Sequence, residues 1–159
     1  MVSKRPFSLL KVLIQVHEPK WLWKTPKNSL FYLDAEGRTI KEASAREGYD
    51  FPLISGVNRK EDLYFAMNDL KLINQELLKY DPAQLSEFYW DPHGGNSLYL
   101  SIFGGNAAPI EIDVGLPPYK VKEKLFAKLM ATLREKKMTA SKIQLLSEKK
   151  SVVKIFPPL

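Results

Sequence analysis

The chain has 159 residues, of which 45% are hydrophobic and 26% charged, with a formal net charge of +6 and no cysteine. These values fit one ordinary globular domain and exclude a disordered chain, disulfides and thiolate metal sites. No stretch approaches eighteen consecutive apolar residues, so the sequence predicts no membrane span and we expect a soluble chain.

The positive charge lies in the C-terminal part of the chain. Residues 120–159 carry eleven Lys or Arg and three Glu, whereas the first 119 residues carry thirteen Lys or Arg and fifteen Asp or Glu. A basic end of this kind suits an acidic protein partner, an anionic membrane surface or nucleic acid. Lysines that merely solvate a helix face explain it equally well.

Short strands are predicted in the first third of the chain. Apolar residues alternate with polar ones before Pro19, and the later segments are separated by turn residues. The predicted strands are residues 9–16, 21–23, 30–33 and 38–40, the last three forming a β-meander. Residues 51–56 follow a polar loop, and Gly56 there permits a left-handed turn.

Two amphipathic helices are predicted. The first begins at Asn58 or Arg59, ends near Lys79 and has apolar residues at spacings of three and four, namely Leu63, Ala66, Met67, Leu70, Ile73 and Leu77. The second begins at residues 115–118, ends near Lys137 and carries lysines on its outer face. Its predicted apolar face contains Val121, Leu125, Phe126, Leu129, Met130 and Leu133.

Three strands, at residues 85–90, 97–103 and 109–114, are predicted between the helices. Glu111 and Asp113 alternate along the last of them and are predicted to pair with lysines of the second helix. The order of elements predicts an α+β domain, in which a mostly antiparallel sheet carries two main helices on one face.

The last twenty residues predict a hairpin, in which residues 147–150 form a polar turn and residues 151–156 a β-branched strand. Pro157 and Pro158 lack amide donors, so this strand should lie late in the sheet or at an edge. An edge strand can accept a strand from a partner. The alternative is a core role for its apolar residues, Val152, Val153 and Ile155.

No catalytic, cofactor or metal site is predicted. His17 and His93 lack metal-ligand spacing, and a solvated turn explains His93 and Asp91 better than a hydrolase that uses His93. A basic module that binds nucleic acid or anionic lipid between Lys120 and Lys142 is the alternative function. Few aromatic residues interleave this stretch and no nucleic-acid motif is present, so we expect no nucleic-acid partner.

Several segments, in this order, resemble the extracytoplasmic part of the bacterial cell-division protein FtsQ, called DivIB in Gram-positive bacteria. The most specific is Pro-Leu-Ile-Ser-Gly at residues 52–56, similar to the family's Leu-Pro-Leu-Ile-Ser-Gly with Phe51 in place of the first leucine. The others are His-Glu-Pro at residues 17–19, the aromatic strand and turn at residues 31–37, and the segments at residues 98–105, 110–115 and 142–156.

The resemblance implies a non-enzymatic scaffold of the divisome that supports septum formation. Residues 1–24 would be the last strand of a POTRA domain and its connection, and residues 25–159 the FtsQ-like β domain. We expect a periplasmic or otherwise extracytoplasmic domain of a single-pass inner-membrane protein, whose membrane anchor and remaining POTRA domain this chain lacks. The implied partners are FtsB and FtsL, with other division proteins bound through the POTRA domain.

In the family, a short FtsB segment adds a strand to the C-terminal edge of the sheet. Strand addition at this edge agrees with the C-terminal edge hairpin that the sequence itself predicts. Phe156 is the expected apolar anchor, at a position where some members have tryptophan, and lysines would steer an acidic partner. The predicted partner-binding residues are Lys149, Lys150, Ser151, Val152, Val153, Lys154, Ile155 and Phe156.

Overall fold

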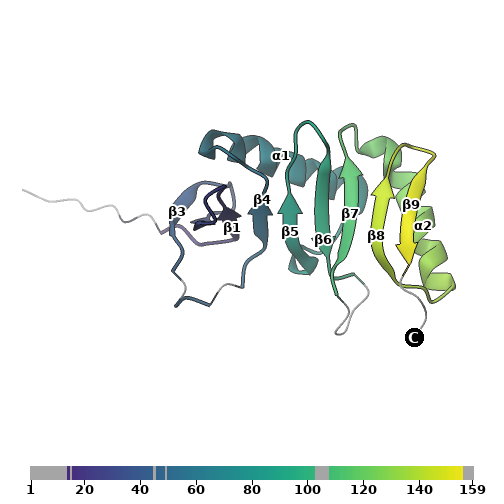
Figure 1. Ribbon diagram of the computed structural model, residues 1–159, viewed down its shortest axis with the longest axis horizontal. Helices are drawn as coiled ribbons and strands as arrows, with labels where there is room; N and C mark the ends of the chain where they lie inside the picture. The colour runs from purple at the N-terminus through teal and green to yellow at the C-terminus, as the bar shows by residue number, and fades with distance from the viewer. Residues whose placement is uncertain (1–13, 15, 45, 49, 103–107, 156–159) are drawn as a thin grey trace, which may run out of the picture.

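The computed structural model describes residues 14, 16–44, 46–48, 50–102 and 108–155. Its strands form a single sheet in the order β3-β2-β1-β4-β5-β6-β7-β8-β9 (Figure 1). The pairs β1–β4, β4–β5 and β7–β8 are parallel, and all other neighbours are antiparallel. The strands are β1 (Trp21–Lys24), β2 (Leu30–Leu33), β3 (Thr39–Glu42), β4 (Leu53–Ser55), β5 (Leu85–Tyr89), β6 (Asn96–Leu100), β7 (Ile110–Gly115), β8 (Ala140–Leu145) and β9 (Ser151–Ile155).

Two helices, α1 (Leu63–Ile73) and α2 (Glu123–Glu135), lie behind the sheet in the view of Figure 1 and cover one of its faces. A single apolar core fills the space between this face and the helices. It contains alternate residues of the central strands, as the pleat requires, with the buried faces of both helices. The predicted α+β fold, with a mostly antiparallel sheet and two main helices on one face, is confirmed.

The first helical segment follows its predicted apolar pattern. A 3-10 turn, η1 (Lys60–Asp62), leads into α1, and a π-helical turn, η2 (Asn74–Leu78), continues it. Ala66, Leu70 and Ile73 are buried because their spacing of three and four places them on one face. Lys79 ends the segment in a left-handed conformation with φ of 47°.

The second helical segment differs from the prediction at its start. A 3-10 turn, η4 (Lys120–Lys122), precedes α2 and has three residues per turn instead of 3.6. Its geometry leaves Val121 47% exposed, although the pattern predicted it to be buried, and buries Lys122 instead. The Lys122 amine is satisfied because it donates to the carbonyl oxygens of Val114, at 2.5 Å, and Leu116, at 3.2 Å.

The N-terminal strand predicted at residues 9–16 falls almost wholly outside the described residues. Ile14 and Val16 are described, lie in no strand and are exposed. Trp21–Lys24 forms β1, which pairs with β2 and β4 and places Trp23 in the core. These four residues therefore belong to the sheet, and the proposed POTRA origin of the preceding residues stays a prediction. Phe103, the predicted end of another strand, also lies outside the described residues.

Asp34 organises the turn between β2 and β3. Its buried carboxylate accepts hydrogen bonds from the backbone N–H groups of Glu36, at 3.0 Å, and Arg38, at 2.9 Å. It also contacts the Arg38 guanidinium, at 3.0 Å, and His17 Nδ1, at 3.2 Å. Burial raises the pKa of Asp34, but these hydrogen bonds and the charge of Arg38 outweigh burial and hold the pKa below its ordinary value.

Asp34→Asn is expected to lower the free energy of unfolding at neutral pH, with a loss that shrinks in acid. Since the folded-state pKa lies below the ordinary value of 3.8, the carboxylate stabilises the fold above that pH and loses its effect as the pH falls through the folded-state pKa. Urea unfolding of both proteins between about pH 7 and about pH 3 measures this difference. A difference that stays constant over this range would contradict the role of the carboxylate charge.

Candidate functional site: the C-terminal sheet edge

Among the described strands, β9 lies at one end of the sheet and pairs only with β8, while β3 forms the other end. It is drawn in yellow beside β8 in Figure 1. The predicted hairpin is confirmed, with the turn at residues 146–150 closed by a hydrogen bond from Leu146 N to Lys150 O at 3.0 Å. One long side of β9 therefore has no strand beside it among the described residues.

The hydrogen-bonding register identifies the backbone groups on the open side of β9. Hydrogen-bonded and non-hydrogen-bonded pairs alternate along an antiparallel ladder. Leu146 and Lys150 form a hydrogen-bonded pair, and the register of β8 and β9 is continuous from Leu145 to Lys142. The alternation then makes Val152 and Lys154 hydrogen-bonded to β8 and leaves the residues between them turned away from it. Counting from the pair of Leu146 and Lys150, the residues whose N–H and C=O groups face the open side are Ser151 and Val153.

The side chains of β9 are only partly used by the core. Val152 is 51% exposed and Ile155 is 41% exposed, whereas Val153 packs against the core. A core role for all three residues is therefore wrong for Val152 and Ile155, because a strand at the edge has no neighbour to cover them. Leu146, in the turn, is a further apolar residue with high exposure, 60%, and was not predicted.

The lysines predicted at this edge are all exposed. Lys149 lies 3.8 Å from Glu148, whereas Lys150 and Lys154 have no ion pair within the described part of the chain. The structure thus brings seven of the eight predicted partner-binding residues together on one turn and one strand. The eighth, Phe156, lies outside the described residues.

The acidic residues of β7 pair differently from the prediction. Lys142 Nζ lies 2.7 Å from Glu111 Oε1, and Gln144 Nε2 lies 3.3 Å from Asp113 Oδ2. Both partners come from β8, because the parallel register places them opposite these residues on the face of the sheet away from α2. The hydrogen bond to Glu111 raises the pKa of Lys142 above its ordinary value.

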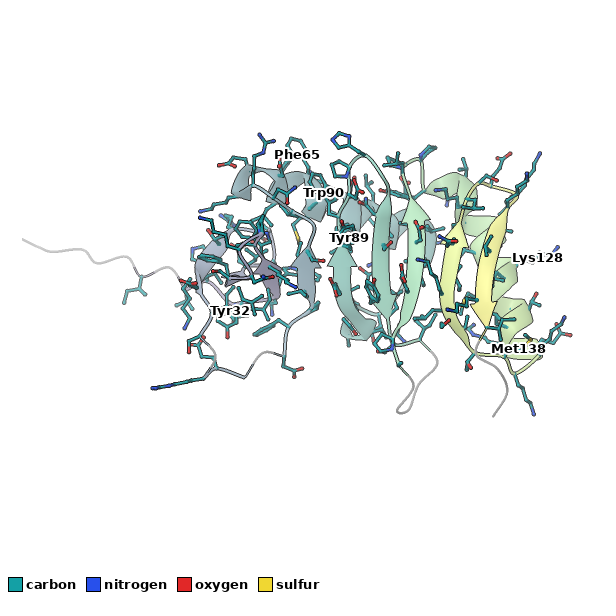
Figure 2. All side chains as sticks on the ribbon, in the orientation of Figure 1. Tyr32, Phe65, Tyr89, Trp90, Lys128 and Met138 are labelled. Atoms are coloured by element: carbon teal, nitrogen blue, oxygen red, sulfur yellow. The ribbon has the colours of Figure 1, made fainter. Side chains whose placement is uncertain are left out.

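The basic stretch between Lys120 and Lys142 is not one continuous surface. Lys120 pairs with Glu123 at 2.5 Å, Lys122 is buried and Lys142 lies on the other face of the sheet. Lys128, labelled in Figure 2 at the β9 end of the molecule, lies on the exposed side of α2. The exposed cations here without an ion pair among the described residues are Lys124, Lys128, Arg134, Lys136 and Lys137.

The region around His93 is a turn held by Asp91. One carboxylate oxygen of Asp91 accepts from the backbone N–H groups of His93, at 2.9 Å, and Gly94, at 2.8 Å. These hydrogen bonds lower the pKa of Asp91. Within the described ranges, no cluster of three His, Cys, Asp or Glu residues could hold a metal ion, and no helix has the length and apolarity to span a membrane.

A model of a known protein family matches most of the chain. Residues 21–149 match the family model described as "Cell division protein FtsQ/DivIB, C-terminal". The chain belongs to the FtsQ/DivIB family, as the sequence resemblance predicted. The matched residues include most of the hairpin turn and end before β9.

Among solved structures, the chain is similar to the major extracytoplasmic domain of the trans isomer of the bacterial cell division protein DivIB from Geobacillus stearothermophilus. The sequence identity is 16% and the TM-score 0.44, with 76% of this chain and 97% of that chain covered. No curated protein sequence matches the chain.

Proposed function

We propose that this chain is a non-enzymatic scaffold domain of the bacterial divisome that recruits a partner by strand addition along β9. Membership of the FtsQ/DivIB family supports the role in cell division. The observation that carries strand addition is the position of β9, which pairs with β8 on one side and has no described strand on its other side. The domain would act outside the cytoplasm, tethered through an upstream membrane anchor.

The two edges of the sheet differ in a way that favours β9. At the opposite edge, the exposed residues of β3 are Lys41 and Glu42, and Lys41 is held by Glu47 at 2.6 Å. Charged residues at an edge discourage pairing with another strand. On β9 two of the three exposed residues, Val152 and Ile155, are apolar and can bury surface against a partner, and the third, Lys154, suits an acidic one.

The partner strand would form ladder hydrogen bonds with the N–H and C=O groups of Ser151 and Val153. Its side chains would contact Val152 and Ile155, with Phe156 as a further apolar anchor. Lys149, Lys150 and Lys154 would raise the association rate of an acidic segment. FtsB- and FtsL-like proteins are the proposed partners, in keeping with the family.

Val153→Pro is expected to lower the affinity for such a partner at least tenfold, or about 1.4 kcal/mol, because proline removes the N–H that faces the open side. The measurement is titration calorimetry with the extracytoplasmic segments of the FtsB and FtsL homologues from the same genome. Circular dichroism would first establish that the variant folds.

Glu42→Pro is the matched control at the opposite edge. Ala43 N donates to Leu30 O at 2.8 Å, so the ladder alternation turns the N–H of Glu42 away from β2. This variant should bind as the unmodified chain does. Equal affinities of the unmodified chain and Val153→Pro would place the site elsewhere, and a steep loss of affinity for anionic ligands with salt would favour the basic face of α2 instead.

A further inference from the structure

A groove of about 620 Å³ lies at the other half of the molecule, between α1, the turn that joins β2 and β3, and the chain that follows η2. Its lining is largely apolar and aromatic, as ligand-binding sites commonly are. The apolar part of the lining consists mainly of Trp21, Tyr64, Met67, Leu70, Tyr80 and Pro82.

Two polar atoms of the groove residues, Trp21 Nε1 and Asn74 Oδ1, are buried and have no hydrogen-bond partner among the residues that the structure describes. The other two tryptophans show what such an indole usually does. Trp23 Nε1 donates to Val57 O at 3.1 Å, and Trp90 Nε1 donates to Asp69 Oδ2 at 2.9 Å. Buried donors and acceptors without partners are rare and costly, so the unpaired donor and acceptor require an explanation.

A peptide unit has the chemistry that these two atoms require. Its carbonyl oxygen can accept from Trp21 Nε1, and an N–H group of the same extended segment can donate to Asn74 Oδ1. Solvent does not reach either atom, so a bound segment would have to displace a neighbouring side chain. Met67 lines the groove and is the most adaptable of its apolar residues, since it has three rotatable bonds.

The charge at the rim selects the kind of segment. Arg38 is already engaged, 3.0 Å from Asp34 and 3.1 Å from Glu36. Lys71 is exposed and has no ion pair within the described ranges. An acidic side chain on the ligand would therefore meet a free ammonium group.

We propose that this groove binds an extended peptide segment of a partner protein, in which an apolar residue lies next to an acidic one. The apolar side chain enters between Trp21, Leu70 and Tyr80, and the acidic side chain pairs with Lys71. The groove is formed at the β1 side of the sheet, with five strands between β1 and β9. This site is therefore separate from the proposed strand-addition edge and does not depend on it.

The probe is the blocked dipeptide N-acetyl-Leu-Glu-N-methylamide, added to the ¹⁵N-labelled chain while the three indole N–H resonances are followed by NMR. The Trp21 resonance, assigned with Trp21→Phe, is expected to shift downfield and to saturate with a Kd of roughly 1–10 mM. The Trp23 and Trp90 resonances should stay in place, because their N–H groups already have acceptors.

Two variants test the residue assignments. Asn74→Leu removes the acceptor and should raise the Kd of the dipeptide at least threefold. The Trp23 and Trp90 resonances should not change. Lys71→Glu should reverse the preference, so that N-acetyl-Leu-Lys-N-methylamide binds better than the Leu-Glu probe. Val153→Pro should leave the titration unchanged, which separates this site from the β9 edge.

The proposal is overturned if the Trp21 resonance does not saturate, or if all three indoles shift together. It is also overturned if Asn74→Leu and Lys71→Glu both bind the probe as the unmodified chain does. If the Trp21 indole N–H exchanges magnetisation with a trapped water and its resonance does not shift on addition of the dipeptide, water is the missing partner and the proposal is overturned.

Discussion

Gly56→Ala is expected to lower the free energy of unfolding by about 3 kcal/mol, which corresponds to a melting temperature about 6–12 °C lower for a domain of this size. Gly56 has φ of 79°, a left-handed conformation that costs an alanine roughly 1–2 kcal/mol. An added Cβ would also lie 2.2 Å from the carbonyl oxygen of Trp90. Both effects act on a backbone that has little freedom to move.

The backbone around Gly56 is fixed from two sides. Trp90 N donates to Ser55 O at 3.0 Å, which continues the parallel pairing of β4 and β5 beyond their ends. The indole of the same Trp90 is held by Asp69 of α1. The Trp90 backbone therefore cannot move away from a new methyl group without breaking its hydrogen bonds to Ser55 and Asp69, the second of which joins the sheet to α1.

Gly48→Ala is the matched control for this prediction. Apart from its two chain neighbours, no described residue has an atom within 4 Å of a Cβ added at Gly48, and the φ of Gly48 lies outside the left-handed region. This variant should change the free energy of unfolding by less than about 0.5 kcal/mol. Thermal unfolding of both variants measures the comparison, and equal melting temperatures would show that the β4 end adapts to a side chain.

The Gly56 geometry also explains why the Pro-Leu-Ile-Ser-Gly segment was the most informative part of the sequence. The segment needs a strand that pairs on both sides, followed at once by a left-handed residue against a neighbouring carbonyl. Only glycine meets the second requirement without strain. Local chemistry of this kind can be read from a sequence because it depends on few neighbouring residues.

The helices were predictable where one repeating face decides their burial. The spacing of Leu63, Leu70 and Ile73 was sufficient to predict the buried face of α1, since all three side chains face the sheet. The same reasoning failed at Val121 and Lys122, where a 3-10 turn changes the period and two backbone carbonyls accept from the lysine amine. Periodicity contains no information about such acceptors.

Of the two candidate surfaces, only the one that depends on a short local stretch could be predicted from the sequence. The prolines after residue 156 indicated where pairing must stop, so the edge position of β9 could be predicted from one short stretch. The groove at Trp21 could not be predicted, because Asn74, which also lines it, lies 53 residues later in the chain. Whether an indole finds an acceptor depends on side-chain placement, which no local pattern specifies.

The second large effect is expected at Asn96, which is fully buried. Its side-chain amide donates to Tyr119 Oη at 2.9 Å and to Asp69 Oδ2 at 3.2 Å, and its oxygen accepts from Asp91 N at 2.9 Å. One side chain thus connects α1, the turn after β5 and the residue that precedes η4. The network fixes both helical segments to the same end of the sheet.

Tyr119 supports this network as a neutral hydroxyl group. Burial, followed by the charge of Asp69, raises the pKa of Tyr119 to about 12. The hydroxyl therefore stays protonated at neutral pH and remains the acceptor for Asn96. Tyr119→Phe removes only this hydroxyl and should cost about 1 kcal/mol of unfolding free energy.

Asn96→Ala should cost about 3 kcal/mol, because it leaves the Asp91 N–H and the Tyr119 hydroxyl without their partner and opens a small cavity. Ser97→Ala, one residue further along β6 and on the other face of the sheet, should cost less than about 0.5 kcal/mol. Urea unfolding of the single variants and of the double variant Asn96→Ala/Tyr119→Phe completes a double-mutant cycle. Since the hydroxyl has already lost its partner in Asn96→Ala, the second change should add less than it costs alone; strict additivity would show that the two side chains are energetically independent.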